Sequence, residues 1–148
     1  MIDSWLSQTK LKNIYEGLVR KLFLGRVSAN QLTIIGLVLG LLSAFLIYLS
    51  GTLPYSTKLI IISCVVMVIS FVLDAMDGAI ARAEKPTRFG GMLDLFSDRT
   101  VEVSIIIAVV STDPILLIWP GLFSLGAMVL CISMFLVVSV LFDQEERS

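Results

Sequence analysis

Histidine is absent from this 148-residue sequence, and charged residues of both signs are scarce. The missing imidazole excludes the side chain that most often serves as a general base or metal ligand. Cysteine occurs only twice, as Cys64 and Cys131, and each lies alone within an apolar run. The two cysteines therefore predict inert packing thiols, with neither a disulfide framework nor a metal-binding spacing.

Hydrophobic residues, by contrast, make up 57% of the chain, and charged residues only 16%. Soluble domains contain about 45–50% apolar and about 25% charged residues. The apolar excess lies in long uninterrupted runs, and a helix of about 20 such residues can cross a bilayer. The sequence thus predicts an all-α integral membrane protein, a single membrane domain over residues 1–148 without internal repeats. A bundle of four transmembrane helices is expected, at about 31–50, 58–81, 90–111 and 114–141.

The amino-terminal segment differs from the apolar runs because it is amphipathic. Within residues 8–24, apolar side chains share one helical stripe, whereas the basic side chains lie largely off it. A basic amphipathic helix ahead of a membrane span is expected to lie in the lipid interface. The first thirty residues contain no compact apolar core followed by a small-residue cleavage site, so a cleavable signal peptide is not expected.

The basic residues predict how the helices are oriented in the membrane. Ten of the eleven lysines and arginines fall in the amino-terminal segment, around the link between the second and third spans, or in the tail. Only Lys58 falls on the other side. Because cytoplasmic segments carry an excess of basic residues, we expect a multi-pass protein with the amino terminus, this link and the tail in the cytoplasm.

Four aspartates, Asp74, Asp77, Asp94 and Asp98, lie inside or next to the second and third apolar runs. Their spacings of three and four residues place each pair on one helix face. The short link 83–89 makes the two helices antiparallel neighbours, so the pairs can face each other on the cytoplasmic side. A carboxylate at membrane depth is costly and usually marks a functional site or an ion path.

Four carboxylates close together repel one another unless a cation lies between them. Oxygen ligands of this kind suit magnesium, manganese or calcium, and not zinc. Gly78 leaves room for a substrate near the backbone, and Gly90 and Gly91 open the third span, where free N–H groups favour an anion. This combination predicts a metal–diphosphate site for phosphoryl or diphosphate displacement. Arg99 and Glu102, three residues apart, predict an ion pair beside it.

The aspartates and glycines also form a longer pattern, Asp74-x-x-Asp77-Gly78-x-x-Ala81-Arg82 followed by Gly90-x-x-x-Asp94-x-x-x-Asp98. This pattern closely resembles the signature of the CDP-alcohol phosphatidyltransferases, and the resemblance covers roughly residues 25–110. The family's first transmembrane helix begins with a segment similar to residues 28–33, SANQLT. The link before Gly90 is one residue shorter than is usual in the family.

The resemblance implies a role for each aspartate of the pattern. Asp74, Asp77 and Asp94 would hold a divalent metal, Mg²⁺ or Mn²⁺, on the diphosphate of a CDP-linked substrate. Asp98 would complete this acidic metal site and act as the general base that takes the proton from the acceptor hydroxyl. Attack of that hydroxyl on the β-phosphorus would release CMP and leave a phosphodiester.

The same resemblance implies the nucleotide contacts and the reaction partners. Gly78 and Ala81 would make room for the cytidine, and Arg82 would help to fix that end of the substrate. The donor would be CDP-diacylglycerol or a similar CDP-alcohol, and the acceptor a polar alcohol such as glycerol phosphate, inositol phosphate or serine. Arg99, which follows Asp98, inclines the acceptor towards inositol phosphate. Membrane lipids would surround the protein, and nucleic acid is not an expected partner. The resemblance leaves open whether the protein forms a homodimer.

Members of this family usually have six spans, so the four expected here predict an amino-terminal portion that binds metal and CDP but transfers poorly. Two other functions stay open: an aspartate-rich membrane prenyltransferase, which also uses magnesium, and a non-enzymatic ion or proton carrier. A carrier needs polar groups through the outer half of the helices, and residues 103–110 and 121–141 supply almost none. Release of CMP from CDP-diacylglycerol would distinguish the enzyme from the carrier.

Overall fold

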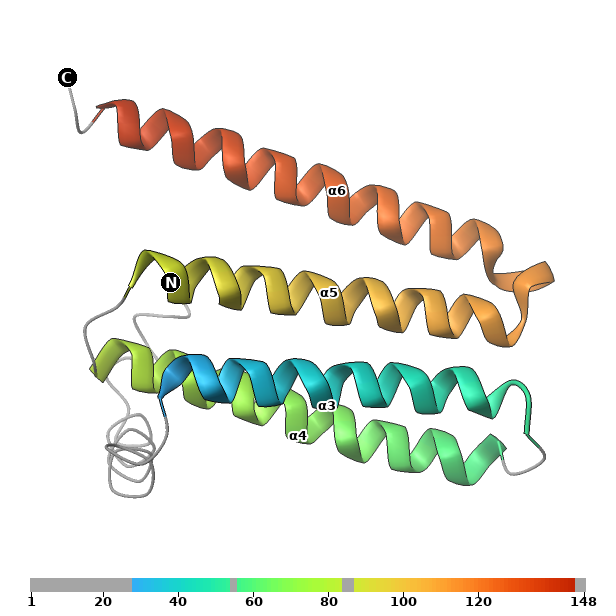
Figure 1. The fold of residues 1–148 in the computed structure, drawn as a ribbon. Coiled ribbons are helices and arrows are strands. Elements are labelled where there is room, and N and C mark those ends of the chain that lie inside the picture. Colours follow the sequence, from blue (N-terminus) through green and yellow to red (C-terminus); the bar gives the residue numbers. More distant parts are fainter. Residues whose placement is uncertain (1–27, 54–55, 84–86, 146–148) are drawn as a thin grey trace, which may run out of the picture.

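The computed structural model describes residues 28–53, 56–83 and 87–145, and within them the chain is helical. Figure 1 shows the four helices, which the structure bounds as follows: α3 Ala29–Ser50, α4 Ser56–Ala83, α5 Arg88–Thr112 and α6 Pro114–Glu145. The predicted all-α class is confirmed for these residues. The predicted interfacial helix over residues 8–24 lies outside them.

The main contacts between the helices follow the order α4, α3, α5, α6. α3 lies against both α4 and α5, whereas α6 packs on α5 and leaves much of its apolar surface exposed (Figure 1). The start of α3, the end of α4 and the start of α5 meet at one end of the bundle. Lys58 lies in the first turn of α4, at the opposite end of that helix.

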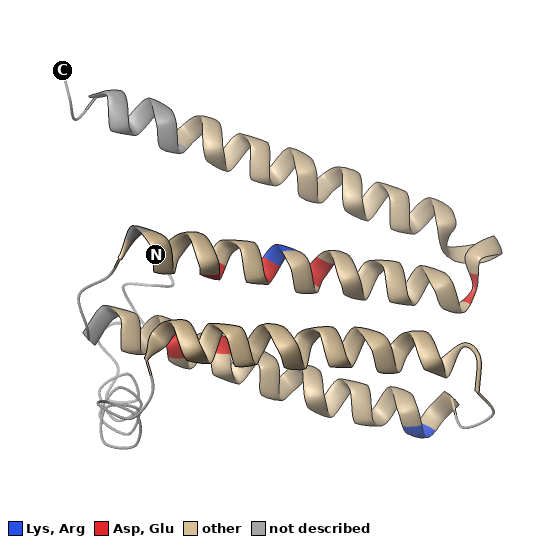
Figure 2. Cartoon of the chain, viewed as in Figure 1, with Lys and Arg blue, Asp and Glu red and all other residues tan. Residues whose placement is uncertain are grey.

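Three of the helices, α3, α4 and α6, are long and apolar enough to cross a membrane, which makes this a membrane protein. α5 is less suited to cross a membrane than the other three, because every 18-residue stretch of it contains the charged residues Asp98, Arg99 and Glu102. Most of the acidic residues coloured in Figure 2 accordingly lie on α5 and on the neighbouring part of α4. The third predicted span, at about 90–111, corresponds to α5 and therefore stays a prediction.

Side-chain caps fix where α3 and α5 begin. Ser28 caps α3 in a reciprocal arrangement: its backbone N–H donates to Gln31 Oε1 at 3.0 Å, and its Oγ accepts from the Gln31 N–H at 3.4 Å. Thr87 caps α5, with its Oγ1 accepting from the Gly90 N–H at 3.0 Å. Such caps satisfy N–H groups that have no partner within the helix.

Buried serines join α3 to α4. The hydroxyls of Ser43 and Ser63 lie 2.9 Å apart, and each also donates to the other residue's carbonyl oxygen. Further along, Ser70 Oγ donates to the Gly36 carbonyl oxygen at 2.8 Å. In a membrane the apolar faces have little preference among partners, so interhelical hydrogen bonds of this kind help to specify the register.

Glycines allow α3 to approach both neighbours closely. A Cβ added at Gly36 would meet the Ser70 carbonyl oxygen of α4 at 3.7 Å, an ordinary contact. A Cβ added at Gly40 would overlap both methyl groups of Val101 on α5. Small residues commonly permit such approaches between membrane helices, and here the approach holds α5 beside α3.

We expect Gly40→Ala to destabilise the bundle, because the new methyl group overlaps Val101 on α5. Overpacking of this kind costs about 1–3 kcal/mol, which exceeds the gain of about 1 kcal/mol that alanine brings to a helix interior. The matched control is Gly126→Ala on α6, where a Cβ has nothing within 4 Å. Thermal unfolding in detergent should fall for Gly40→Ala and stay level or rise for Gly126→Ala; equal midpoints would contradict the close α3–α5 contact.

Candidate active site

Three carboxylates come together between α4 and α5. Asp74 of α4 and Asp94 and Asp98 of α5 each place an oxygen within 4.8 Å of the other two, and all three side chains are partly buried. The one ion pair found among the described side chains joins Arg99 to Glu102, as predicted, so no described lysine or arginine is paired with these three aspartates. Hard oxygen ligands at this separation fit a divalent cation such as Mg²⁺ or Mn²⁺.

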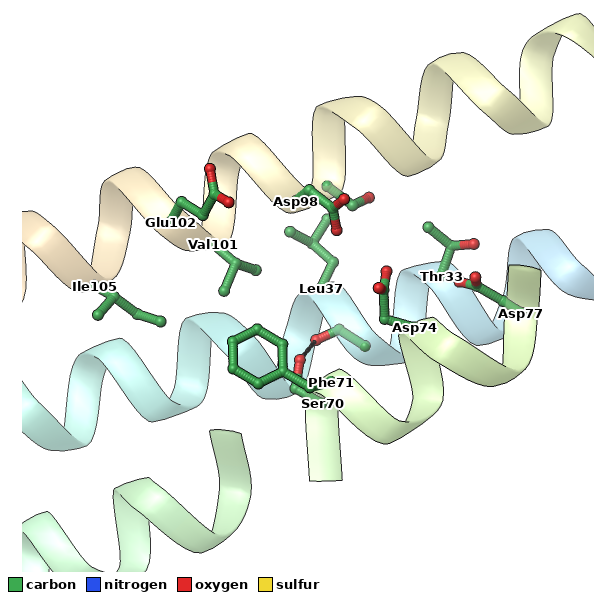
Figure 3. A pocket seen from close by; sticks show the side chains of 12 residues that line it. Thr33, Leu37, Ser70, Phe71, Asp74, Asp77, Asp98, Val101, Glu102 and Ile105 are labelled. Atoms are coloured by element: carbon green, nitrogen blue, oxygen red, sulfur yellow. Dashed lines mark hydrogen bonds between the residues drawn. The ribbon is translucent and has the colours of Figure 1, made fainter. Parts of the chain in front are cut away.

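Asp77 lies outside this group of three, although the resemblance to the family signature implies that it is a metal ligand. Its side chain is 3% exposed, and its Oδ2 has no hydrogen-bond partner among the described residues. Figure 3 shows its carboxylate beside Thr33 of α3, one helical turn from Asp74. An unpartnered buried carboxylate oxygen is costly, so this site too is suited to a cation or a hydrogen-bond donor.

A cavity of about 230 Å³, called the outer cavity below, lies where the ends of the three helices meet. The predicted nucleotide-binding residues Gly78 and Ala81 line it, and so do both glycines that open α5. The side chain of Arg82 lies outside the described part of the chain. The full lining is Ser28, Ala29, Asn30, Thr33, Asp77, Gly78, Ala81, Thr87, Gly90, Gly91 and Asp94.

A second cavity, called the inner cavity below, also has a volume of about 230 Å³ and lies deeper between the same helices. Figure 3 shows the carboxylates of Asp74 and Asp98 beside the apolar side chains that line it. The lining is Thr33, Gly36, Leu37, Ser70, Phe71, Asp74, Asp77, Ser97, Asp98, Val101, Glu102 and Ile105.

The two cavities follow one another along the bundle and meet at the acidic residues. Thr33 and Asp77 line both of them. Asp94 lines the outer cavity, whereas Asp74 and Asp98 line the inner one. A molecule bound in each cavity would therefore meet the other at the carboxylates, the arrangement that a transfer between two substrates requires.

Sequence reasoning did not assign site roles to the hydroxyl and amide side chains around the carboxylates. Asn30 and Thr33 come from the segment SANQLT, which the sequence pattern marks only as the beginning of a helix. Their three-residue spacing, which puts both on one helix face, was the available signal. Ser97 and Thr87 gave no signal in the sequence, because only the packing of α5 decides that they line a cavity.

Comparison with known proteins agrees with this geometry. The sequence model of the family described as CDP-alcohol phosphatidyltransferase matches residues 26–146. The chain belongs to the CDP-alcohol phosphatidyltransferase family. The family is divalent-metal-dependent, and the acidic group in the structure fits that property.

Two curated relatives resemble the chain over most of its length. One is the archaetidylinositol phosphate synthase of Pyrococcus horikoshii, 35% identical over 101 residues, which are 68% of this chain and 50% of the relative. The other is the bifunctional IPC transferase and DIPP synthase of Aquifex aeolicus, 29% identical over 117 residues, covering 70% of this chain and 25% of the relative. The chain thus spans half or less of the length of these relatives. No solved structure matches it.

We expect Asp94→Asn to weaken divalent-cation binding by more than about tenfold, because even residues that only support a metal ligand typically contribute 10- to 100-fold. Binding of Mn²⁺ by the purified chain, followed by electron paramagnetic resonance, measures this directly. The control is Asp113→Asn, which changes an exposed aspartate whose Oδ1 accepts from the Leu116 N–H at the start of α6. Equal Mn²⁺ affinity in the two variants would exclude a cation site at the acidic group.

Proposed function

We propose that this site transfers the phosphoalcohol group of a CDP-alcohol, such as CDP-diacylglycerol, to a polar alcohol and releases CMP. The observation that carries the proposal is the group of Asp74, Asp94 and Asp98 at the junction of two cavities. Membership in the CDP-alcohol phosphatidyltransferase family supports it. The same membership favours this reaction over the prenyltransferase and the ion carrier, for which no comparison gives support.

The residues that would hold the cation are Asp74, Asp94 and Asp98, with Asp77 as a fourth ligand. Oxygen-only ligands favour Mg²⁺ or Mn²⁺. When bound, such an ion supplies Lewis-acid stabilisation of the charge that develops on the diphosphate. The unpartnered Oδ2 of Asp77 supports its inclusion, since a carboxylate oxygen without a donor among the described residues is free to take a cation.

The outer cavity is the proposed site of the CDP group. Gly78 and Ala81 leave space along α4 for the cytidine, and Arg82 would fix that end. Gly90 and Gly91 lie in the first turn of α5, where the helix dipole favours the diphosphate. Their own N–H groups already donate to Thr87 Oγ1 and to the Thr87 carbonyl oxygen, so the free N–H groups expected from the sequence are not those of the glycines. Asn30 and Thr87, both polar and both lining this cavity, are further candidates for contacts with the nucleotide.

The acceptor alcohol would then approach from the inner cavity, on the other side of the carboxylates. Its oxygen forms a bond to the β-phosphorus as the bond from that phosphorus to the CMP oxygen breaks. The leaving oxygen keeps the electron pair, and the proton of the acceptor hydroxyl passes to Asp98. A carboxylate has two oxygens, so Asp98 can face the acidic group with one and the acceptor with the other.

The acceptor we propose is an inositol phosphate, since a relative at 35% identity is an archaetidylinositol phosphate synthase. Glycerol phosphate and serine are the alternatives that an assay has to compare. The distribution of basic residues in the sequence supports a site that opens to the cytoplasm, where water-soluble acceptors are available.

The direct experiment incubates the full chain with CDP-diacylglycerol, Mg²⁺ and each acceptor in turn and measures CMP. We expect slow CMP release that requires both the metal and the acceptor. Release without an acceptor would indicate hydrolysis, and no release with any acceptor, together with no metal-dependent binding of CDP, would refute the proposal.

We expect Asp77→Asn to raise the Mg²⁺ concentration needed for half-maximal CMP release by about tenfold or more, because the amide keeps the shape of the side chain but lacks its charge. The comparison is made at saturating donor and acceptor. An unchanged Mg²⁺ requirement would show that Asp77 serves the site only through packing or hydrogen bonds.

We expect Asp98→Asn to bind the CDP-alcohol nearly normally and to transfer very slowly. A general base typically contributes about 10²–10⁴-fold to the rate, whereas the donor contacts lie mainly in the outer cavity, which Asp98 does not line. Single-turnover release of CMP at saturating substrates measures the rate, and calorimetry measures CDP affinity. A large loss of CDP affinity with an unchanged rate would instead make Asp98 mainly a ligand.

A further inference from the structure

One hydroxyl on α5 behaves differently from all the others on that helix. The other four Ser and Thr hydroxyls of α5 each donate to a carbonyl oxygen one turn earlier, at 2.7–2.8 Å. Ser97 Oγ makes no hydrogen bond to any described residue. Serine and threonine inside a helix ordinarily bond back to the preceding turn or point to solvent, and Ser97 does neither.

Ser97 is also almost completely buried, at 4% exposed, and it lines the inner cavity next to Asp98. A buried hydroxyl without a partner costs free energy, and such groups in proteins usually have a partner or a functional reason. The cavity beside Ser97 is large enough to hold that partner. The missing hydrogen-bond partner of Ser97 is therefore best supplied by a molecule bound in the inner cavity.

The chemistry of the inner cavity restricts what that molecule can be. Its polar lining includes three carboxylates besides Asp77, those of Asp74, Asp98 and Glu102, together with Ser97. Carboxylates accept hydrogen bonds and repel anions, so the cavity suits hydroxyl groups and disfavours a phosphate. The hydroxyl-bearing part of a polar alcohol fits this description, with any phosphate of that alcohol directed away from the carboxylates.

We propose that Ser97 hydrogen-bonds to the acceptor alcohol in the inner cavity and holds its attacking hydroxyl beside Asp98. This inference rests on the proposed transferase function and extends it to the acceptor. Ser97 forms no covalent bond and loses no proton: its Oγ accepts from, or donates to, an acceptor hydroxyl, while the proton released in the reaction goes to Asp98. Its neighbour Asp98 thus receives an acceptor that is already oriented.

The experiment compares Ser97→Ala with Ser104→Ala in the full chain, with myo-inositol 1-phosphate as the acceptor and CMP release as the readout. Loss of one hydrogen bond should lower kcat/KM for the acceptor about three- to tenfold, with the KM for CDP-diacylglycerol and the affinity for Mn²⁺ unchanged. Ser104 is the matched control, because its Oγ donates to the Thr100 carbonyl oxygen and lines neither cavity.

Thermal unfolding distinguishes this role from a structural one. Because Ser97 Oγ has no partner among the residues that the structure describes, Ser97→Ala should leave the midpoint unchanged or raise it, even as acceptor kcat/KM falls. A lower midpoint together with equal losses for donor and acceptor would make Ser97 structural and overturn the inference. Unchanged kinetics of Ser97→Ala for both substrates would also overturn the role of Ser97 but would leave the proposed transferase function intact. If the unmodified chain shows no metal-dependent CMP release, both proposals fail.

Discussion

Repulsion among carboxylates held close together in an apolar bundle is the constraint on which this structure depends. Asp74, Asp94 and Asp98 have oxygens within 4.8 Å of one another. Full charges at that distance repel by roughly 3 kcal/mol per pair at an effective dielectric constant of about 20. None of the described lysines and arginines forms an ion pair with these aspartates, so the bundle presents an excess of negative charge that suits a divalent cation.

The rest of the bundle keeps that site in place. α3 carries no charged residue, yet it contacts both helices that carry the aspartates. Gly40 lets α3 lie against Val101 of α5, and Gly36 accepts a hydrogen bond from Ser70 of α4. Since α3 fixes both neighbours at once, the separation of Asp74 from Asp94 and Asp98 is set by contacts that involve none of the three.

The carboxylates lie between two cavities whose linings differ in chemical character. The outer cavity is built from helix ends and glycines, features that accept a phosphate-bearing nucleotide. The inner cavity has apolar walls and carboxylates, features that accept hydroxyl groups. In the proposed reaction, two substrates placed in this way would meet at the acidic residues from different sides, as displacement at phosphorus requires of its attacking and leaving oxygens.

The sequence by itself determined the helical membrane class, the acidic pattern and the family, because apolar runs and fixed spacings along a helix are local properties. It also indicated that Asp74 faces Asp94 and Asp98, since a short link forces the two helices to be neighbours. Only the tertiary structure decided that Asp77 stands apart from that group and that Thr33 and Ser97 line the cavities. Those outcomes depend on how α3 packs against α4 and α5, and contacts between residues far apart in the chain leave no periodic trace in the sequence.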